Sequence, residues 1–428
     1  MRLIPLSLAE LRALDLGRLE GETQTVTGVE IDSRRVGPGD LFVALGGGAA
    51  FLDDARAHGA AATLVPEDGF AAMAALGRAV RERTDARVVA ITGSSGKTST
   101  KDILAALCRP VARTVAAEGG HNNEIGLPLT LTRIEPDTEI VLTEMGMRGL
   151  GQIAELCAIA RPDVAVITAI GPVHLELVHT VANVARAKAE AIAALPVGGV
   201  AIVPAGVPEL EAVLLRDDID VHRFGRGGDA WLEAFVPGQS VRVTFFDGRR
   251  LELPVPFTVR VQAANLVAAL LTYRALGLPL ERAAEGSAEI VFSRWRCEES
   301  PLPGGGLLIN DAYNANPASM RAALEHLVER AGPRRKVAVL GEMAELGAEA
   351  TRFHEELGAS ARTLGVDVIV GVGELGRRYG PEEWAADAAS AVEVVRAVVE
   401  PGDTVLVKAS RAVGLEVVAE ALAGVAAQ

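Results

Sequence analysis

Short apolar runs recur along the chain, and each is followed by a turn and a segment rich in alanine and leucine. The runs are continuous rather than alternating, and they are rich in valine and isoleucine. This pattern is typical of strands that are buried on both faces of a parallel sheet, and strands that alternate with helices indicate an α/β fold. The runs lie at residues 88–91, 140–143, 164–168, 200–203, 307–309, 336–340, 366–370 and 404–407.

One stretch has a different pattern. Residues 231–257 alternate between apolar and polar side chains, and Asp247-Gly248 separates two short apolar runs within it. An Asp-Gly pair between alternating runs predicts a β-hairpin, so we expect an antiparallel insert at the edge of the sheet. A helix is predicted over residues 262–276, ending at Gly277.

Two segments suggest domain boundaries. Residues 78–86 are charged and precede the first strong strand, whereas residues 292–306 contain Pro301, Pro303 and three glycines and predict a linker. The predicted fold class is therefore α/β in three domains. These are an N-terminal α/β domain at 1–85, a central domain with a parallel sheet and an antiparallel insert at 86–293, and a Rossmann-like C-terminal α/β domain at 294–428.

Composition narrows the class of protein. The chain has 428 residues, 49% hydrophobic and 23% charged, which excludes a disordered, fibrous or disulfide-framework protein. A net charge of −14 argues against general binding to nucleic acid or to an anionic membrane. The three cysteines, Cys108, Cys157 and Cys297, are widely spaced and predict buried thiols in a reducing compartment.

The sequence predicts neither a signal peptide nor a membrane anchor. The first ten residues lack an apolar run, and the long uncharged stretch at residues 191–207 is interrupted by Pro196, Gly198, Gly199 and Pro204. A membrane helix needs about 20 continuous apolar residues. This stretch instead predicts a helix end, a turn and a strand, and we expect a cytoplasmic protein.

The run at residues 88–91 leads into the sequence TGSSGKTS and then a helical segment. Glycines let successive backbone N–H groups face one anion, and the start of the helix adds its positive end. Lys97 would then reach the terminal phosphates of a nucleotide and the Thr98 hydroxyl would bind Mg²⁺, although only two residues, not the usual four, separate the first glycine from Gly96. The bland alternative is a Gly/Ser turn. The candidate ATP-binding residues here are Gly93, Ser94, Ser95, Gly96, Lys97, Thr98 and Ser99.

Three further polar residues stand near strand ends or on the following helix. Glu144 ends one predicted strand, where ligands of parallel sheets bind, and could hold Mg²⁺; the alternative is a surface carboxylate. His174 follows the next strand and is by itself more often a hydrogen-bonded structural residue than a ligand. Lys188 lies on the next predicted helix, and its position alone favours a solvated face by about nine to one.

Several motifs occur together with the phosphate loop. They read DSRR at 32–35, NNEIG at 122–126, NDAYNANP at 310–317, LGEMAELG at 340–347 and VKASR at 407–411. In combination they resemble the Mur ligase family, the ATP-dependent amide ligases of peptidoglycan precursor synthesis. The run at 310–317 most resembles the branch that adds D-alanyl-D-alanine. The chain departs from the family in a shortened loop at 46–51, in Gly120, where asparagine is common, and in His121, where an apolar residue is common.

The resemblance implies roles for individual residues. Lys97, Glu144, His174 and Lys188 match catalytic positions, and two Mg²⁺ ions would be held by Thr98, Glu144, His174 and a CO₂-derived carbamate on Lys188. Further ATP contacts match Asn265, Arg294, Asp311 and Asn314. Substrate contacts match Ser33, Arg34, Asn122 and Asn123, and Lys408, Ser410 and Arg411 are candidates for the C-terminal site.

The resemblance also implies a reaction. A monomer is expected to transfer the γ-phosphoryl group of ATP to UDP-MurNAc-tripeptide, and the amine of D-alanyl-D-alanine would then attack the acyl phosphate. Three alternatives remain open from the residues: a ligase that adds a single amino acid to a muramoyl peptide or glutamate to folate, an NTPase that only hydrolyses nucleotide, and a non-catalytic nucleotide-sugar binder.

Overall fold

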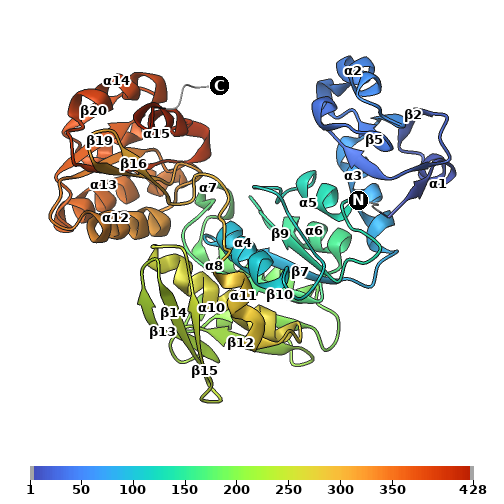
Figure 1. Ribbon diagram of the computed structural model, residues 1–428, viewed down its shortest axis with the longest axis horizontal. Coiled ribbons are helices and arrows are strands. Elements are labelled where there is room, and N and C mark those ends of the chain that lie inside the picture. The colour runs from blue at the N-terminus through green and yellow to red at the C-terminus, as the bar shows by residue number, and fades with distance from the viewer. Residues whose placement is uncertain (1–3, 425–428) are drawn as a thin grey trace.

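The computed structural model describes residues 4–424. Three units follow one another along the chain, and the central unit lies between the other two (Figure 1). We refer to them as the N-terminal unit (β1 to α3), the central unit (β7 to α11) and the C-terminal unit (β16 to α15). Each contains a β-sheet with helices packed against it, which confirms the predicted α/β class.

The N-terminal unit contains a two-stranded sheet and a four-stranded sheet of order β2-β6-β5-β4. Helix α3 packs against α5 and α6 of the central unit, and one apolar cluster runs through both units. The elements are β1 Leu6–Ser7, α1 Leu8–Ala13, β2 Gly17–Gly21, β3 Thr25–Val26, β4 Gly28–Glu30, η1 Ser33–Arg35, β5 Asp40–Val43, η2 Gly46–Phe51, α2 Leu52–Ala57, β6 Ala62–Pro66 and α3 Gly69–Arg81.

The central unit is built on a nine-stranded sheet of order β15-β14-β13-β12-β11-β10-β7-β9-β8, which is parallel except for its β13–β15 end. Helix α10 covers one apolar face of this sheet. The elements are β7 Arg87–Thr92, α4 Lys97–Cys108, β8 Thr114–Ala116, α5 Gly126–Leu131, β9 Ile140–Glu144, α6 Gln152–Ala160, β10 Val164–Ile167, α7 Leu175–Val178, α8 Val181–Ala193, β11 Val200–Pro204, α9 Pro208–Glu211, β12 Asp220–Phe224, β13 Ala230–Val236, β14 Ser240–Phe245, β15 Arg250–Pro254, α10 Arg260–Ala275, η3 Leu280–Arg282 and α11 Ala283–Ser287.

The C-terminal unit has a six-stranded sheet of order β16-β17-β21-β18-β19-β20, parallel apart from β16. Apolar clusters lie on both faces of the sheet. The elements are β16 Glu298–Leu302, β17 Gly306–Asn310, α12 Pro317–Ala331, β18 Lys336–Gly341, η4 Gly347–Glu349, α13 Ala350–Thr363, β19 Val368–Val372, η5 Leu375–Tyr379, β20 Glu383–Ala385, α14 Ala388–Val398, β21 Thr404–Lys408, η6 Arg411–Val413 and α15 Glu416–Leu422.

All eight apolar runs form strands, and the predicted hairpin is the antiparallel pair β14–β15 at the sheet edge. Helix α10 ends where expected, and Gly277 takes the left-handed φ of +75°. The predicted linker at 292–306 is partly wrong, because it contains strand β16 with Pro301 inside it. Proline is tolerated there because β16 is an edge strand. Within residues 4–424, no helix is both long and apolar enough to span a membrane.

Strand register brings the predicted site together at one edge of the central sheet. Ile91 of β7 pairs with Glu144 of β9, and Thr92 pairs with Ile167 of β10. The phosphate loop, Glu144 and the segment leading to His174 therefore emerge side by side from the carboxyl ends of three neighbouring strands. This is where open α/β sheets bind ligands.

Candidate active site

The phosphate loop is held by groups from elements around it. Gly93 and Gly96 have left-handed φ angles of +151° and +80°. A Cβ on Gly93 would lie 1.9 Å from the Thr168 hydroxyl, and one on Gly96 would lie 2.7 Å from the Asn265 side-chain oxygen. Both positions therefore require glycine. Asn265, which the resemblance gives as an ATP contact, lies directly against the loop and lines the cavity beside it.

Lys97 and Thr98 begin helix α4 and lie where a terminal phosphate would arrive. The Lys97 ammonium donates to the Gly93 carbonyl at 2.9 Å. Loss of hydration and the positive charge of Arg296 lower the pKa of Lys97, while the nearby Glu144 carboxylate opposes that shift. The Thr98 side chain is buried. A cation and a hydroxyl thus stand together at the helix start, as phosphate binding with Mg²⁺ requires.

Glu144 is buried at the end of β9, not a surface carboxylate. Its Oε1 accepts a hydrogen bond from the Asn122 amide at 2.9 Å, whereas its Oε2 is buried with no hydrogen-bond partner among the described residues. The Asn123 side chain instead accepts from the backbone N–H groups of Ile125 and Gly126 and caps helix α5. Of the two asparagines, Asn122 is therefore the one whose side chain contacts Glu144 at the carboxyl end of the central sheet.

Lys188 is buried on helix α8, so the expectation of a solvated lysine is wrong. Burial lowers the pKa of Lys188 well below its usual range, and the Lys97 ammonium lowers it further. A neutral amine is the form that can react with CO₂, so this environment suits the carbamate that the resemblance implies. Burial also lowers the pKa of His174, against the opposing effect of the Glu345 carboxylate.

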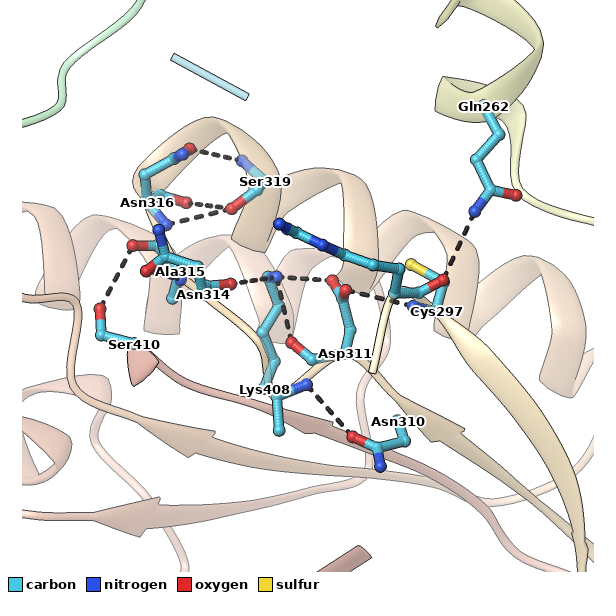
Figure 2. Close-up of polar contacts among 12 residues, drawn as sticks. Gln262, Cys297, Asn310, Asp311, Asn314, Ala315, Asn316, Ser319, Lys408 and Ser410 are labelled. Carbon is cyan, nitrogen blue, oxygen red and sulfur yellow. Dashed lines mark hydrogen bonds and ion pairs between the residues drawn. The ribbon is translucent and has the colours of Figure 1, made fainter. Parts of the chain in front are cut away.

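The C-terminal unit closes a cavity over the phosphate loop. Lys408 is buried, and its ammonium donates to the Asp311 carboxylate at 2.5 Å and to the Asn314 carbonyl at 2.8 Å (Figure 2). Gln262 reaches from α10 toward the backbone carbonyl of Arg296, in the segment that leads into β16. The cavity is lined by residues of the phosphate loop, α10, the linker and the C-terminal unit: Ser94, Ser95, Gly96, Lys97, Thr98, Ser99, Val259, Val261, Gln262, Asn265, Arg296, Cys297, Asp311, Asn314, Asn316, Ala318, Ser319, Ala322, Ala323 and Lys408.

Arg296 lines the nucleotide cavity, where the resemblance implied Arg294. Its guanidinium donates to the Thr98 hydroxyl at 2.8 Å and lies 3.9 Å from the centre of the Tyr313 ring. Arg294, two residues earlier, has a side chain that is 77% exposed and lies 3.6 Å from Glu420. Arg294 does not line the cavity and Arg296 does. Two arginines with this spacing could not be distinguished by sequence reasoning alone.

Other residues at the site were also missed. Asn316 donates to the Ser94 carbonyl at 3.1 Å, which connects helix α12 to the phosphate loop. Thr168 donates to the Ser95 carbonyl from the end of β10. Asn316 lies in the NDAYNANP run and could have been found from that motif, whereas nothing in the sequence singled out Thr168.

The two remaining candidates for the C-terminal site, Ser410 and Arg411, differ in their contacts and in their exposure. The Ser410 hydroxyl accepts from the Ala344 N–H at 2.9 Å and donates to the Ala315 carbonyl at 3.3 Å, so both of its partners are backbone groups. The Arg411 guanidinium lies 4.5 Å from the centre of the Trp295 ring, and its side chain is 52% exposed. Of these two side chains Arg411 is the more exposed, and its guanidinium already lies 2.6 Å from the Glu416 carboxylate.

Ser33 and Arg34 lie on the N-terminal unit and do not line this cavity. Ser33 is buried, whereas Arg34 is exposed and bonded to Asp32, whose pKa is lowered to about 2 by that pairing. Next to them, Arg35 lies 3.2 Å from Glu118 of the central unit. This contact connects the DSRR motif, which holds two of the expected substrate contacts, to the segment that leads to Asn122.

The residues present fit a magnesium ion bound together with a nucleotide. Glu144 Oε2 is a buried oxygen without a hydrogen bond, and the Thr98 hydroxyl lies at the start of the adjacent helix. Within residues 4–424, no three His, Cys, Asp or Glu side chains form a ready-made metal cluster. Magnesium commonly takes one or two protein carboxylates and completes its shell with phosphates and water, so this sparse set is suitable.

The comparisons with known proteins agree with this geometry. The sequence pattern of the Mur ligase middle domain matches residues 91–273, and that of the Mur ligase glutamate ligase domain matches residues 295–411. The chain is 32% identical to the UDP-N-acetylmuramoyl-tripeptide–D-alanyl-D-alanine ligase of Escherichia coli (strain K12), over 98% of this chain and 99% of that protein. The chain belongs to the Mur ligase family.

Solved Mur ligase structures have the same architecture over nearly the whole chain. A crystal structure of MurF from Acinetobacter baumannii has a TM-score of 0.86 at 28% identity and covers 99% of this chain and 100% of its own. MurF from Thermotoga maritima, solved in complex with ADP, has a TM-score of 0.80 at 29% identity, covering 93% of this chain and 97% of its own. The three-unit arrangement is therefore that of a Mur ligase.

Proposed function

We propose that this protein joins D-alanyl-D-alanine to UDP-MurNAc-tripeptide, with ATP converted to ADP and phosphate, in peptidoglycan precursor synthesis. The observation that carries the proposal is one cavity in which the phosphate loop of the central unit meets Asp311, Asn314 and Asn316 of the NDAYNANP run. The relative in Escherichia coli, whose name states this activity, is similar over the full length of both proteins.

The chemistry has two steps. A carboxylate oxygen of the tripeptide attacks the γ-phosphorus of ATP, the bond to the ADP oxygen breaks, and an acyl phosphate forms. The dipeptide amine then attacks the acyl carbon and loses a proton, and phosphate leaves from the tetrahedral intermediate. Both reactants of the first step are anions, so the Lys97 ammonium and the loop N–H groups must offset their repulsion.

Four side chains would hold Mg²⁺: Thr98, Glu144, His174 and a carbamylated Lys188. The ions would supply charge stabilisation of the transferring phosphoryl group. Lys188 supports this assignment because its environment favours the neutral amine. Glu144 supports the assignment because its Oε2 is buried without a hydrogen-bond partner among the described residues and could therefore bind a cation.

The remaining assignments follow the positions of the side chains. Asn265, Asp311 and Asn314, together with Arg296 in place of Arg294, surround the nucleotide. Ser33, Arg34, Asn122 and Asn123 belong to the muramoyl-peptide side, and Arg411 to the dipeptide side with Lys408 and Ser410 supporting that region. We assign residues 1–85 to the nucleotide-sugar domain, 86–293 to the ATP domain and 294–428 to the ligase domain of a cytoplasmic monomer.

The test is the coupling of ADP release to both substrates. Purified protein is incubated with Mg·ATP and each muramoyl precursor, with and without D-alanyl-D-alanine, and both ADP and amide product are measured. We expect sustained ADP release and amide formation only with the tripeptide precursor and the dipeptide together. Equal ADP release with no peptide substrate would instead identify a simple NTPase, and a requirement for a single amino acid would identify another ligase.

A further inference from the structure

One carboxylate of the C-terminal unit reaches into the central unit beside the proposed metal site. Glu345 lies between β18 and η4, and its Oε2 is hydrogen-bonded to Nδ1 of His174. Its other oxygen lies 3.3 Å from the Arg148 guanidinium. Figure 1 shows helix α7, which begins directly after His174, lying next to the C-terminal unit.

Close backbone contacts with the start of helix α7 hold the segment that carries Glu345 in place. Glu345 has a left-handed φ of +62°, a conformation that glutamate rarely adopts. Its carbonyl accepts from the Glu176 N–H at 3.3 Å, and a Cβ on Gly347 would lie 3.1 Å from the Glu176 Cα. The segment therefore packs closely on the start of α7, and a strained residue is held there by contacts between two units.

The hydrogen bond also determines which nitrogen of the imidazole is available. When the Glu345 oxygen is the acceptor in this contact, Nδ1 of His174 carries the hydrogen. In the neutral ring, the lone pair is then on Nε2. Metals bind imidazole through such a lone pair, and the partner of the other nitrogen fixes the ring orientation.

We propose that Glu345 is a positioning residue that holds His174 as a metal ligand, so that this ligand is fully in place only while the C-terminal unit is docked on the central unit. The inference rests on the proposed metal role of His174. It adds that metal binding in the central unit depends on a side chain supplied by another unit. Metal affinity and docking of the C-terminal unit are then thermodynamically linked.

Arg148 provides a matched control. It contacts the same carboxylate, but its side chain is 73% exposed, and exposed ion pairs contribute little to stability. Arg148→Ala removes this interdomain contact without touching His174. Glu345→Ala removes both contacts, and Glu345→Gln keeps an acceptor oxygen for Nδ1 while removing the charge.

The experiment measures binding of Mn²⁺, used in place of Mg²⁺, to the full chain with saturating ADP and no other substrate, by electron paramagnetic resonance. Wild type, His174→Ala, Glu345→Ala, Glu345→Gln and Arg148→Ala are compared after thermal unfolding has verified that each is folded. We expect the His174-dependent site to weaken about 10- to 100-fold in Glu345→Ala, because loss of a partner to a ligating histidine has effects of that size. Glu345→Gln should recover part of the affinity, and Arg148→Ala should bind within about threefold of wild type.

A double-variant comparison completes the test. In a His174→Ala background, Glu345→Ala should cause no further loss of Mn²⁺ binding, since the residue it positions is gone. Wild-type affinity in Glu345→Ala, an equal loss in Arg148→Ala, or a full additional loss in the double variant would each overturn the inference. If Glu345→Ala does not fold, the comparison of Glu345→Gln with Arg148→Ala decides. If His174→Ala binds as wild type does, the metal role itself fails, which is a different result from failure at Glu345 alone.

Discussion

Replacing Gly120 with alanine should weaken the contact between the central and C-terminal units. Gly120 lies against Tyr313, and a Cβ added to it would lie 1.7 Å from the Tyr313 hydroxyl oxygen. Ordinary van der Waals contact begins near 3.4 Å, so the Tyr313 hydroxyl would have to move about 1.7 Å away from the new Cβ. Tyr313 cannot move freely, because its ring lies under the Arg296 guanidinium in the nucleotide cavity.

The expected size of the effect follows from the cost of overpacking. Forcing an extra methyl group into a packed contact costs about 1–3 kcal/mol, and each 1.4 kcal/mol corresponds to about tenfold. If the strain is confined to the docked arrangement, Gly120→Ala should lower kcat/KM for ATP by about 5- to 100-fold. The thermal unfolding midpoint should change little, because neither unit is strained when they separate.

Tyr313→Phe should relieve the clash that Gly120→Ala creates. Tyr313→Phe removes the hydroxyl, and the nearest ring atom is then 3.1 Å from the added Cβ, a tight contact that small shifts can relieve. The double variant Gly120→Ala/Tyr313→Phe should therefore be more active than Gly120→Ala alone. Initial rates of ADP and amide formation at varied ATP measure this. An unimpaired Gly120→Ala, or a double variant no better than the single one, would refute the steric argument.

Three further changes test other parts of the site and fold. Lys97→Ala should lower the ligase rate by about 10²–10⁴ without loss of folding, because the loop N–H groups remain; more than about a tenth of the wild-type rate would contradict this. Lys188→Ala should also lose most activity, with partial recovery in added formate or acetate, and Lys188→Arg should stay inactive because a cation cannot replace the proposed carboxylate. Burial raises the pKa of the Glu299 carboxyl, but hydrogen bonds from His326, Arg330 and Thr258 together outweigh burial and lower that pKa to about 2. That stabilisation is complete above the unfolded pKa near 4.3 and is lost as pH falls toward 2, so the difference in urea unfolding between wild type and Glu299→Gln should shrink over that window.

Eight strands of the two large sheets could be predicted because each contains a continuous apolar run, whereas the strands β8, β12 and β20 lack such a run and were not predicted. The short strands of the N-terminal unit have no such run and were not predicted. Strand β16 was read as a linker because Pro301 and the following glycines are turn residues in most settings, yet an edge strand has no ladder hydrogen bond to lose there. In each case the missing information is where a strand lies in its sheet, at the edge or in the middle, and the sequence alone does not provide it.

The candidate site was predictable where a motif specifies geometry and not elsewhere. The phosphate loop follows from a strand, a glycine-rich turn with Lys97-Thr98 and a helix in succession, but the burial of Lys188 depends on how helix α8 packs, which its own residues do not reveal. The placement of Arg296 rather than Arg294 depends on left-handed φ angles of +62° at Trp295 and +54° at Cys297. Such conformations at non-glycine residues are imposed by tertiary contacts and leave no signal in the sequence.

The glycines around the nucleotide cavity also bear on how readily this enzyme could escape an inhibitor. Each of three glycines lies directly against a polar side-chain atom of another element: Gly93 against the Thr168 hydroxyl, Gly96 against the Asn265 amide oxygen and Gly120 against the Tyr313 hydroxyl. A side chain at Gly93 or Gly96, which also have left-handed φ angles, would displace its neighbour, so a tolerated change there needs a matching second substitution. A compound that binds against these backbone positions would therefore face a surface that single mutations cannot alter without damaging catalysis, and resistance there would require paired events.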